Sequence, residues 1–248
     1  MAVQRVIGDR FKDDPICRIQ GKMDMPVMTR TESQYMVKRV DFFAEQVKQR
    51  VWDSFEDFDQ QVNAHIYGNP EYMFSGDFAD LAEIADIVFE DKMEFSELLF
   101  DLSRNITLAS VAALYHQWER DIRQFLEREL WHYAEDPDTV WTQSTENILH
   151  WLEVHGWPIQ RYKWFPIMDA CRLVVNVYKH GKGRSLNELK NKYPHYLDLI
   201  EDVVSDEGKQ VLPYIDHDHL HVTEERFDEF VEAIRQFWST FPEQIYLK

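Results

Sequence analysis

The sequence predicts an all-α protein, a helical bundle with long helices and a C-terminal helical extension. Apolar residues recur every three or four positions over several long stretches, which is the period of a helix with one buried side. No stretch shows the strict alternation that marks a half-buried strand. Glycine and proline are scarce, at 8 and 9 of 248 residues, whereas folds built from strands need many tight turns.

The N-terminal part divides into an arm and a first helix. Residues 1–30 show no clear period and contain Pro15 and Pro26, so we expect an irregular arm or a short extended segment. From Thr31 an apolar stripe predicts a long helix to about Ile66, where the sequence YGNPEY ends it. No long linker interrupts residues 31–248, which we therefore interpret as a single helical domain.

Two long helices are predicted in the middle of the chain. The first, over about residues 77–102, has an apolar side that includes Ile87 and Leu98. Its other side is densely acidic, which is typical of a solvated face. The second helix, over residues 107–135, has a continuous apolar stripe and stops before Pro137.

The C-terminal third predicts shorter helices and one long final helix. Helices are expected over about residues 145–154 and 165–180, followed by two short helices split by Pro194 and an irregular stretch over 205–222. The last helix begins after Thr223, whose hydroxyl suits an N-cap position.

Composition predicts a cytoplasmic protein that does not enter membranes. Hydrophobic residues make up 44% of the chain, yet no apolar run approaches the roughly 20 residues of a membrane span. The first residues lack the apolar segment of a signal peptide. Cys17 and Cys171 lie far apart and outside any CxxC pair, as expected for reduced thiols. No cofactor motif is present, so we expect none.

Charge is unevenly distributed along the chain. The net charge is −18, and such a surface repels nucleic acid unless positive charge is concentrated locally. Residues 161–192 contain eight Lys and Arg against two Asp and Glu, so this basic segment carries +6 and the remainder carries −24. A basic face of this kind could also complement an acidic face in a homodimer.

The helix predicted over residues 165–180 has one apolar side and one side of mixed polar residues. Asp169, Arg172, Asn176, Lys179 and His180 fall within about 100° of arc on an ideal helix. One interpretation is an ordinary amphipathic helix, whose C-terminal cations suit the helix dipole.

The other interpretation is a site for phosphodiester chemistry. His180 could move a proton, while Arg172 and Lys179 stabilise charge on a phosphorane-like transition state and Asn176 orients the reacting groups. Lys182 and Arg184 follow in a glycine-containing loop, and they complete a set of phosphate-binding candidates with Lys179.

Two segments resemble the HEPN superfamily. They are Leu114–Glu119, with the pattern LYxxWE, and Arg172–Gly181, with the pattern RxxxNxxKHG, inside a region of about residues 75–190. The resemblance implies an α-helical, usually dimeric protein of a prokaryotic defence or toxin–antitoxin system. It also implies a metal-independent ribonuclease site at a dimer cleft, with Arg172, Asn176 and His180 as catalytic residues. The family has Arg directly before the Asn, where this chain has Val175, and Arg172 is the nearest upstream substitute.

Two other groups of residues invite a functional interpretation. His217, His219 and His221 alternate in sequence and would share one side of an extended strand, where three imidazoles could bind Zn²⁺. The alternative is a loop that happens to be rich in histidine. Glu119 and Arg123, four residues apart, are expected to form a helix-stabilising ion pair.

The sequence leaves two functions open. The first is a HEPN-like ribonuclease that acts on RNA through the basic helix face. The second is a non-catalytic interaction protein with a HEPN-like bundle that forms a homodimer or binds a cognate protein partner. The acidic composition and Val175 favour the second, and the basic segment favours the first.

Overall fold

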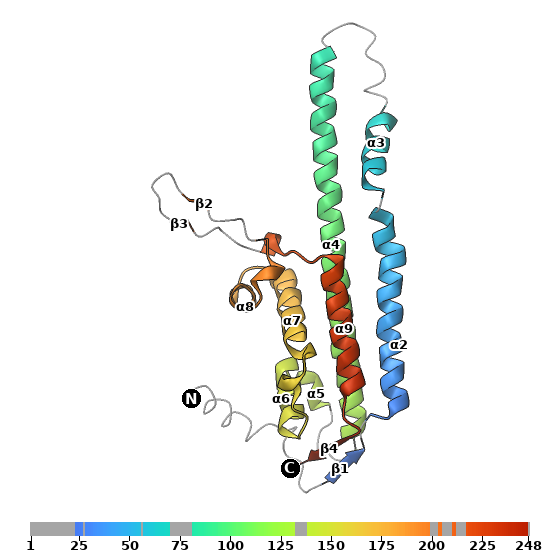
Figure 1. Ribbon diagram of the computed structural model, residues 1–248, viewed down its shortest axis with the longest axis vertical. Helices are drawn as coiled ribbons and strands as arrows, with labels where there is room; N and C mark the ends of the chain where they lie inside the picture. Colours follow the sequence, from blue (N-terminus) through green and yellow to red (C-terminus); the bar gives the residue numbers. More distant parts are fainter. Residues whose placement is uncertain are drawn as a thin grey trace.

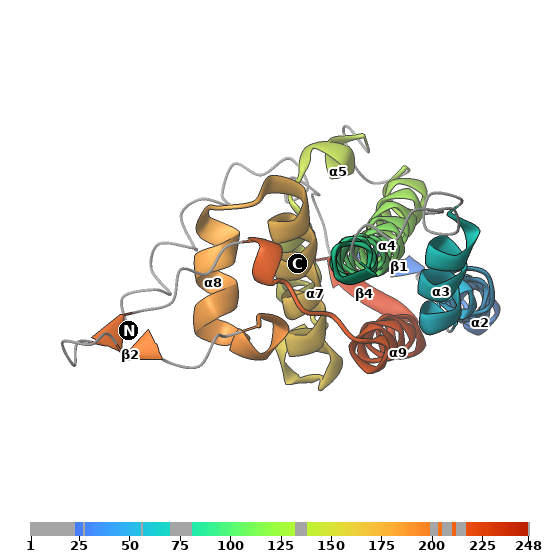
Figure 2. The same ribbon diagram turned by 90° about the horizontal axis from the view of Figure 1, so that it is seen from above.

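Four helices lie side by side and form a bundle in the computed structural model (Figure 1). They are α2 (Arg30–Val47), the C-terminal half of α4 (Leu81–Leu130), α7 (Trp164–His180) and α9 (Glu224–Thr240). The structure describes residues 23–26, 28–55, 57–69, 81–131, 138–198, 203–204, 210–211 and 217–247. Seen from above, α4 and α9 lie between α7 on one side and α2 on the other (Figure 2). The predicted all-α fold class is confirmed.

Shorter elements connect and cover the bundle. They are β1 (Met23–Pro26), η2 (Lys48–Trp52, a π-helix), η3 (Asp53–Phe55), α3 (Phe58–Gly68), α5 (Thr139–Thr142), α6 (Thr145–Val154), η5 (Ile159–Arg161), α8 (Arg184–Lys192), η6 (Pro194–Tyr196), β2 (Val203–Val204), β3 (Gln210–Val211), η7 (His217–His219) and β4 (Gln244–Leu247). Both strand pairs are antiparallel, β1 with β4 and β2 with β3.

The first helix is interrupted where the sequence predicts a continuous one. A capping box begins α2, in which Thr29 Oγ1 accepts from Glu32 N at 3.2 Å and Glu32 Oε2 accepts from Thr29 N at 3.0 Å. At Lys48 the α-helix gives way to the π-helical turn η2, which is followed by η3, and a new α-helix, α3, begins at Phe58. The predicted end of this region is confirmed, because α3 stops at Gly68.

The two helices predicted over residues 77–102 and 107–135 are a single helix, α4. The predicted boundary between them falls in a polar stretch, whose side chains bond back to carbonyls of the same helix. Asn105 donates to Asp101 O at 2.9 Å, Thr107 to Ser103 O at 3.0 Å and Ser110 to Ile106 O at 2.8 Å. Because these groups are satisfied within the helix, the polar stretch continues it.

Predictions for three C-terminal helices agree closely with the structure, whereas of the two short helices expected around Pro194 the first is α8 and the described residues after it form only the 3-10 turn η6. Helix α6 spans the predicted residues 145–154, and α7 begins at Trp164. Helix α9 starts after Thr223, whose Oγ1 accepts a hydrogen bond from Arg226 N at 3.4 Å. The predicted pair is also formed, with Arg123 Nη2 2.9 Å from Glu119 Oε1.

Aromatic side chains form the centre of the bundle. Phe237 of α9 lies between Trp118, Trp157 and Trp164, with ring centroids 5.1–5.3 Å apart. Most buried hydrophobic residues form one contiguous cluster that runs from Met28 before α2 to Phe241 after α9, and Val62, Ile66 and Leu99 lie outside it. Within the described ranges, no helix is both long enough and apolar enough to cross a lipid bilayer.

Two helical segments extend beyond the bundle. We call them the arm from here on, and they are distinct from the irregular N-terminal arm predicted over residues 1–30. The arm consists of α3 and residues 84–103 of α4, which continue past the end of α9 (Figure 1). His65 of α3 stacks on Phe95 of α4 at 4.0 Å between ring centroids, and its Nε2 lies 3.0 Å from Asp91 Oδ2. These contacts hold the two segments of the arm together.

Candidate functional site

Helix α7 carries the residues that the sequence singled out. Its apolar side is buried in the bundle, including Val175, which is 1% exposed. The helix ends at Gly181, which adopts φ +68° and donates its N–H to Val177 O at 2.8 Å. A left-handed conformation of this kind favours glycine, which explains why the helix stops there.

Arg172 lies among carboxylates. Its Nη2 is 2.7 Å from Asp169 Oδ1, its Nη1 is 2.7 Å from Glu146 Oε1, and Glu188 Oε2 of α8 is 3.9 Å away. The side chain is only 15% exposed. Arg172 therefore joins α7 to α6 and α8, and its charge is largely compensated inside the protein.

The pKa values of this cluster follow from the same contacts. Burial disfavours the charged forms of both Arg172 and Asp169. Hydrogen bonding and charge from the partner residues outweigh burial, so the pKa of Arg172 is raised and that of Asp169 is lowered. Lys192 Nζ, 3.3 Å from Asp169 Oδ2, adds to the effect on Asp169. The cluster is ionised and paired at neutral pH.

The rest of the predicted catalytic set lies beyond this cluster. Lys179 and His180 are exposed at the end of α7, and Asn176 is half-buried. Among the described residues, no hydrogen bond or ion pair links Asn176 or His180 to another side chain or to Arg172. The HEPN signature has Arg at the position of Val175. In this chain that side chain faces the core and so lies on the apolar side of α7, not on the polar side with Asn176.

The phosphate-binding candidates after α7 are exposed, and one of them, Arg184, is paired with a carboxylate. Arg184 is 92% exposed and its Nε lies 2.6 Å from Glu188 Oε1. Lys182 is also exposed, in the loop between α7 and α8. Part of the positive charge of the predicted basic segment is therefore compensated by carboxylates. Asp169 and Glu188 lie within the segment, and Glu146 lies outside it.

The histidine-rich segment does not form the extended strand on which the zinc hypothesis depends. Residues His217–His219 form the 3-10 turn η7, which sends successive side chains in different directions. His221 Nδ1 lies 3.3 Å from Asp198 Oδ1. Among the side chains that the structure describes, no group of three or more His, Cys, Asp or Glu is placed to hold a metal ion. The side chain of His217 lies outside them.

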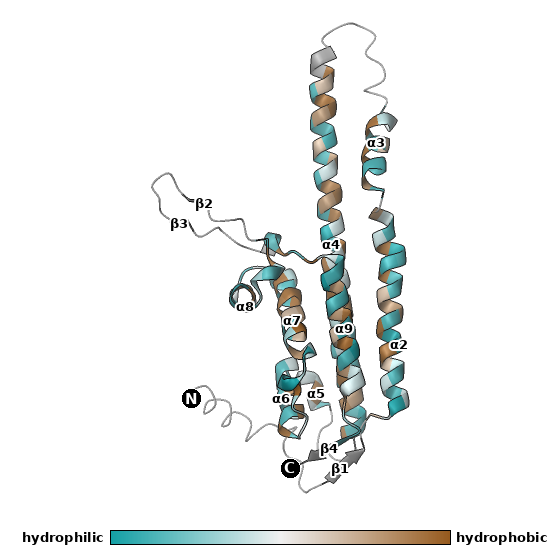
Figure 3. Cartoon of the chain, in the orientation of Figure 1, coloured by the Kyte–Doolittle hydropathy of each residue, from teal (hydrophilic) through white to brown (hydrophobic). Residues whose placement is uncertain are grey.

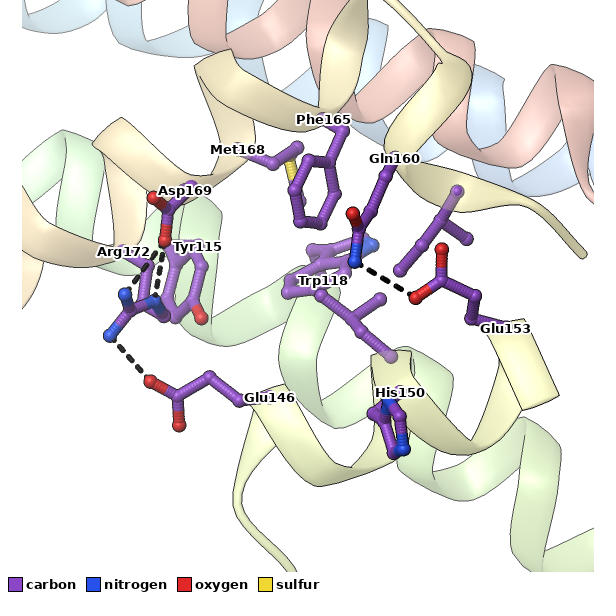
Figure 4. A pocket seen from close by; sticks show the side chains of 12 residues that line it. Tyr115, Trp118, Glu146, His150, Glu153, Gln160, Phe165, Met168, Asp169 and Arg172 are labelled. Atoms are coloured by element: carbon purple, nitrogen blue, oxygen red, sulfur yellow. Dashed lines mark hydrogen bonds and ion pairs between the residues drawn. The ribbon is translucent and has the colours of Figure 1, made fainter. Parts of the chain in front are cut away.

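A cavity of about 110 Å³ lies beside Arg172, between α4, α6, η5 and α7 (Figure 4). Each helix contributes residues from one of its faces, spaced three, four or seven apart. The lining is Tyr115 and Trp118 from α4, Glu146, Leu149, His150 and Glu153 from α6, Ile159 and Gln160 from η5, and Phe165, Met168, Asp169 and Arg172 from α7.

The cavity has an aromatic interior and an acidic rim. Trp118 and Tyr115 are buried at its inner end, and Phe165 faces Trp118 across it (Figure 4). On the rim, Glu153 Oε2 accepts from Gln160 Nε2 at 2.9 Å, and Glu146 pairs with Arg172. An apolar recess with convergent polar groups is the usual form of a small-molecule site.

Sequence reasoning found only part of this cavity. It noted Trp118 and Arg172 but missed Glu146, Glu153 and Phe165. The available signal was the seven-residue spacing of Glu146 and Glu153 on α6, repeated by Phe165 and Arg172 on α7. Comparison with protein-family models, with curated proteins and with solved structures found no match.

The arm is the other candidate site. The sequence predicts Ile87 and Leu98 on the buried side of α4, but both are about half exposed or more. The correction has a simple cause, because among the helices that the structure describes it is the short α3 that covers this part of α4. Exposed apolar side chains on the arm segment of α4 are Ile87, Phe89, Met93, Leu98, Phe100 and Leu102. A group of this size commonly marks an interaction surface.

Proposed function

We propose that the chain is a non-catalytic interaction protein, a HEPN-like helical bundle that presents the arm to a helix of a partner protein. The resemblance to the HEPN superfamily supports, as part of this proposal, a role in a prokaryotic defence or toxin–antitoxin system. The observation that carries the proposal is the exposed apolar stripe on α4, described next.

Three bulky side chains form this stripe. Phe89, Met93 and Phe100 are each more than half exposed. They fall within about 40° of arc on an ideal helix. The stripe lies roughly 120–160° around the helix from Phe95, the residue that stacks on His65 of α3. It therefore faces away from α3.

A row of carboxylates borders the stripe on one side. Asp86, Glu90, Glu97 and Asp101 are all exposed and follow the stripe at an offset of roughly 40–100°. Lys92 is the one basic residue in residues 84–103, which contain six acidic residues. The arm thus offers an apolar row with a strongly negative border.

The complementary surface is a helix with a row of bulky apolar residues bordered by Lys or Arg. Such a helix would bury the stripe and pair with the acidic row, as in helix-in-groove recognition. A second copy of the arm fits poorly in an antiparallel two-fold arrangement, because the acidic border of one copy would face that of the other. The proposal therefore commits to a basic amphipathic helix from another protein.

The test uses two synthetic peptides and fluorescence anisotropy. One peptide is an amphipathic helix with a Leu row bordered by Lys, and the other replaces Lys with Glu. We expect the Lys peptide to bind with an affinity that falls as salt rises, and the Glu peptide to bind far more weakly. The double variant Phe89→Ala/Met93→Ala should lose binding. Phe42→Ala, which removes an equally exposed aromatic on α2, is the matched control and should keep it.

Several outcomes would overturn this proposal. They are equal binding of both peptides, no binding of the Lys peptide, or the same loss in Phe42→Ala. A dimer that dissociates in the Phe89→Ala/Met93→Ala variant would identify a second copy as the occupant instead.

The homodimer predicted from the basic end of α7 is a separate contact, and Lys179→Glu with Arg184→Glu should dissociate it in sedimentation velocity.

The second candidate function is a metal-independent ribonuclease. One observation favours it: His180, Lys179 and Asn176 lie on one face of α7, and among the described residues Asn176 and His180 have no hydrogen-bond or ion-pair partner. The test is wild-type protein on a mixed RNA pool with EDTA, beside His180→Ala. Cleavage by wild type that His180→Ala abolishes would support it, and His195→Ala is the control. Arg172→Ala is unsuitable because Arg172 holds three helices together.

A further inference from the structure

We propose that the cavity between α4, α6, η5 and α7 binds a small organic cation that carries an oxygen acceptor, such as an amino alcohol or its quaternary ammonium form. This site is distinct from the arm and does not depend on the function proposed for it. Three features of the cavity lead to this ligand class: its aromatic interior, its acidic rim and one buried donor.

The aromatic interior suits an ammonium group. Tyr115, Trp118 and Phe165 line the cavity together with the polarizable thioether of Met168 (Figure 4). A cation close to an aromatic ring is attracted to it, and the attraction grows when water is excluded. Tyr115 and Trp118 are almost wholly buried, so a ligand that reaches them is largely desolvated.

The charge of the rim selects a cation over an anion. Glu146, Glu153 and Asp169 line the cavity, and Arg172 is its one Lys or Arg. Arg172 is already compensated, since Asp169 and Glu146 each lie 2.7 Å from its guanidinium nitrogens. Glu153 accepts from the neutral amide of Gln160. Asp169 is also paired with Lys192, whose Nζ lies 3.3 Å from its Oδ2. The surplus negative charge of the rim, which a cation would neutralise, is therefore centred on Glu153.

A buried donor explains the need for an oxygen on the ligand. Trp118 is 2% exposed, and its Nε1–H has no acceptor among the described residues. Three other buried indole groups share this property, but Trp118 is the one of them that lines this cavity. A buried donor without an acceptor destabilises the empty site. A hydroxyl oxygen of the ligand would satisfy it.

The rim also gives the ligand a way in. Glu146 and Gln160 are exposed, and His150 and Glu153 are half-buried, so the polar edge of the cavity faces solvent. The aromatic residues lie at the inner end. A ligand would enter with its ammonium group near Glu153 and Glu146 and its remaining atoms against Trp118 and Phe165.

Three probes of similar shape separate these contributions. Choline has both the charge and the oxygen, 3,3-dimethyl-1-butanol is its neutral isostere, and tetramethylammonium has the charge without the oxygen. We expect choline to bind at least about tenfold more tightly than the neutral isostere, measured by calorimetry. The indole N–H signal of Trp118 in the nitrogen-15 correlation spectrum should shift with choline and much less with tetramethylammonium.

Variants then locate the site. Glu153→Gln keeps the shape but removes charge, and it should weaken choline about tenfold while leaving 3,3-dimethyl-1-butanol unchanged. Trp118→Phe should remove the preference for choline over tetramethylammonium. Matched controls are Glu232→Gln on α9 and Trp157→Phe, neither of which lines this cavity. Circular dichroism and thermal melting confirm that each variant folds.

The proposal fails if the neutral isostere binds as well as choline, if none of the three probes binds, or if Glu153→Gln has no effect. Tighter binding of acetate or phosphate than of choline would show an anion site centred on Arg172. Equal effects of the control and test variants would place binding elsewhere on the molecule.

Discussion

The two halves of α4 belong to one unbroken helix but have different surroundings. In the bundle half, Leu114 is 1% exposed, and α7 and α9 pack against the helix. In the arm half, Leu98 is 60% exposed, and the short helix α3 packs against the helix. Both halves carry hydrophobic residues, which Figure 3 shows as brown segments in the arm half and in the visible part of the bundle half of α4.

The difference shows what an apolar pattern can and cannot determine. A stripe of apolar residues indicates that a helix has a side to bury, but it does not say which chain supplies the cover. For the bundle half, α7 and α9 of the same chain supply it. For the arm half, the stripe of Phe89, Met93 and Phe100 is left to a partner under the proposed function.

The largest expected effect comes from the same substitution in the two halves. Leu114→Ala should lower the free energy of unfolding by about 3 kcal/mol, because it removes a buried side chain and leaves a cavity. Leu98→Ala should change it by less than about 0.5 kcal/mol, since surface substitutions rarely do more. Urea unfolding of the isolated protein, followed by circular dichroism, measures both.

A large loss for Leu98→Ala would mean that the arm is already covered in the isolated protein. Sedimentation of the same samples would then show whether a second copy covers it. Similar small losses at both positions would contradict the assignment of Leu114 to the core.

Much of the fold could be predicted from the sequence because its signals are local. The period of the apolar stripes gave α6, α7 and α9 nearly to the residue, and Thr223 marked the start of α9. The continuity of α4 across residues 102–107 was not predicted, because side chains such as Thr107 can either break a helix or bond back to its carbonyls. Which of these occurs depends on the packing of the flanking turns.

The candidate site was harder to predict because its contacts join distant segments. Helical spacing placed Arg172 and Asn176 correctly on the polar side of α7. It could not show that Glu146, which lies 26 positions earlier, would pair with Arg172, or that Glu188 would approach from α8. The cavity combines one face from each of the helices α4, α6 and α7 with the turn η5. No single stretch of sequence reveals how these faces meet.

The contrast between enclosed and exposed positions extends to charged residues. Arg172→Met should lower the free energy of unfolding by about 2 kcal/mol, because it leaves the mostly buried Asp169 without its main partner. Arg184→Met removes a pair whose cation is 92% exposed and should cost less than about 0.5 kcal/mol. Urea unfolding at neutral pH distinguishes the two, and equal losses would contradict the structural role assigned to Arg172.

The pH dependence of stability should reflect Asp169 as well. Its pKa is lowered in the folded state, so its contribution is present above the unfolded pKa of about 4 and is lost as pH falls through the folded value. Asp169→Asn should therefore cost about 1 kcal/mol at pH 7 and progressively less in acid. Asp86→Asn on the arm is the control, and an acid-dependent loss as large as that of Asp169→Asn would contradict this explanation.

The smallest expected effect concerns the arm alone. His65 joins α3 to α4 by stacking on Phe95 and by its 3.0 Å contact with Asp91, and both partners of that contact are partly exposed. His65→Ala should therefore change the global free energy of unfolding by only about 0.5 kcal/mol. Local opening of the arm should become easier, since segments with few buried contacts open independently of the core. In hydrogen exchange with mass spectrometry, peptides from residues 84–103 should exchange faster in the variant, while those from residues 107–130 stay as in wild type. Faster exchange in both halves of α4 would mean that the arm and the bundle open together, and that the comparison between them describes exposure but not stability.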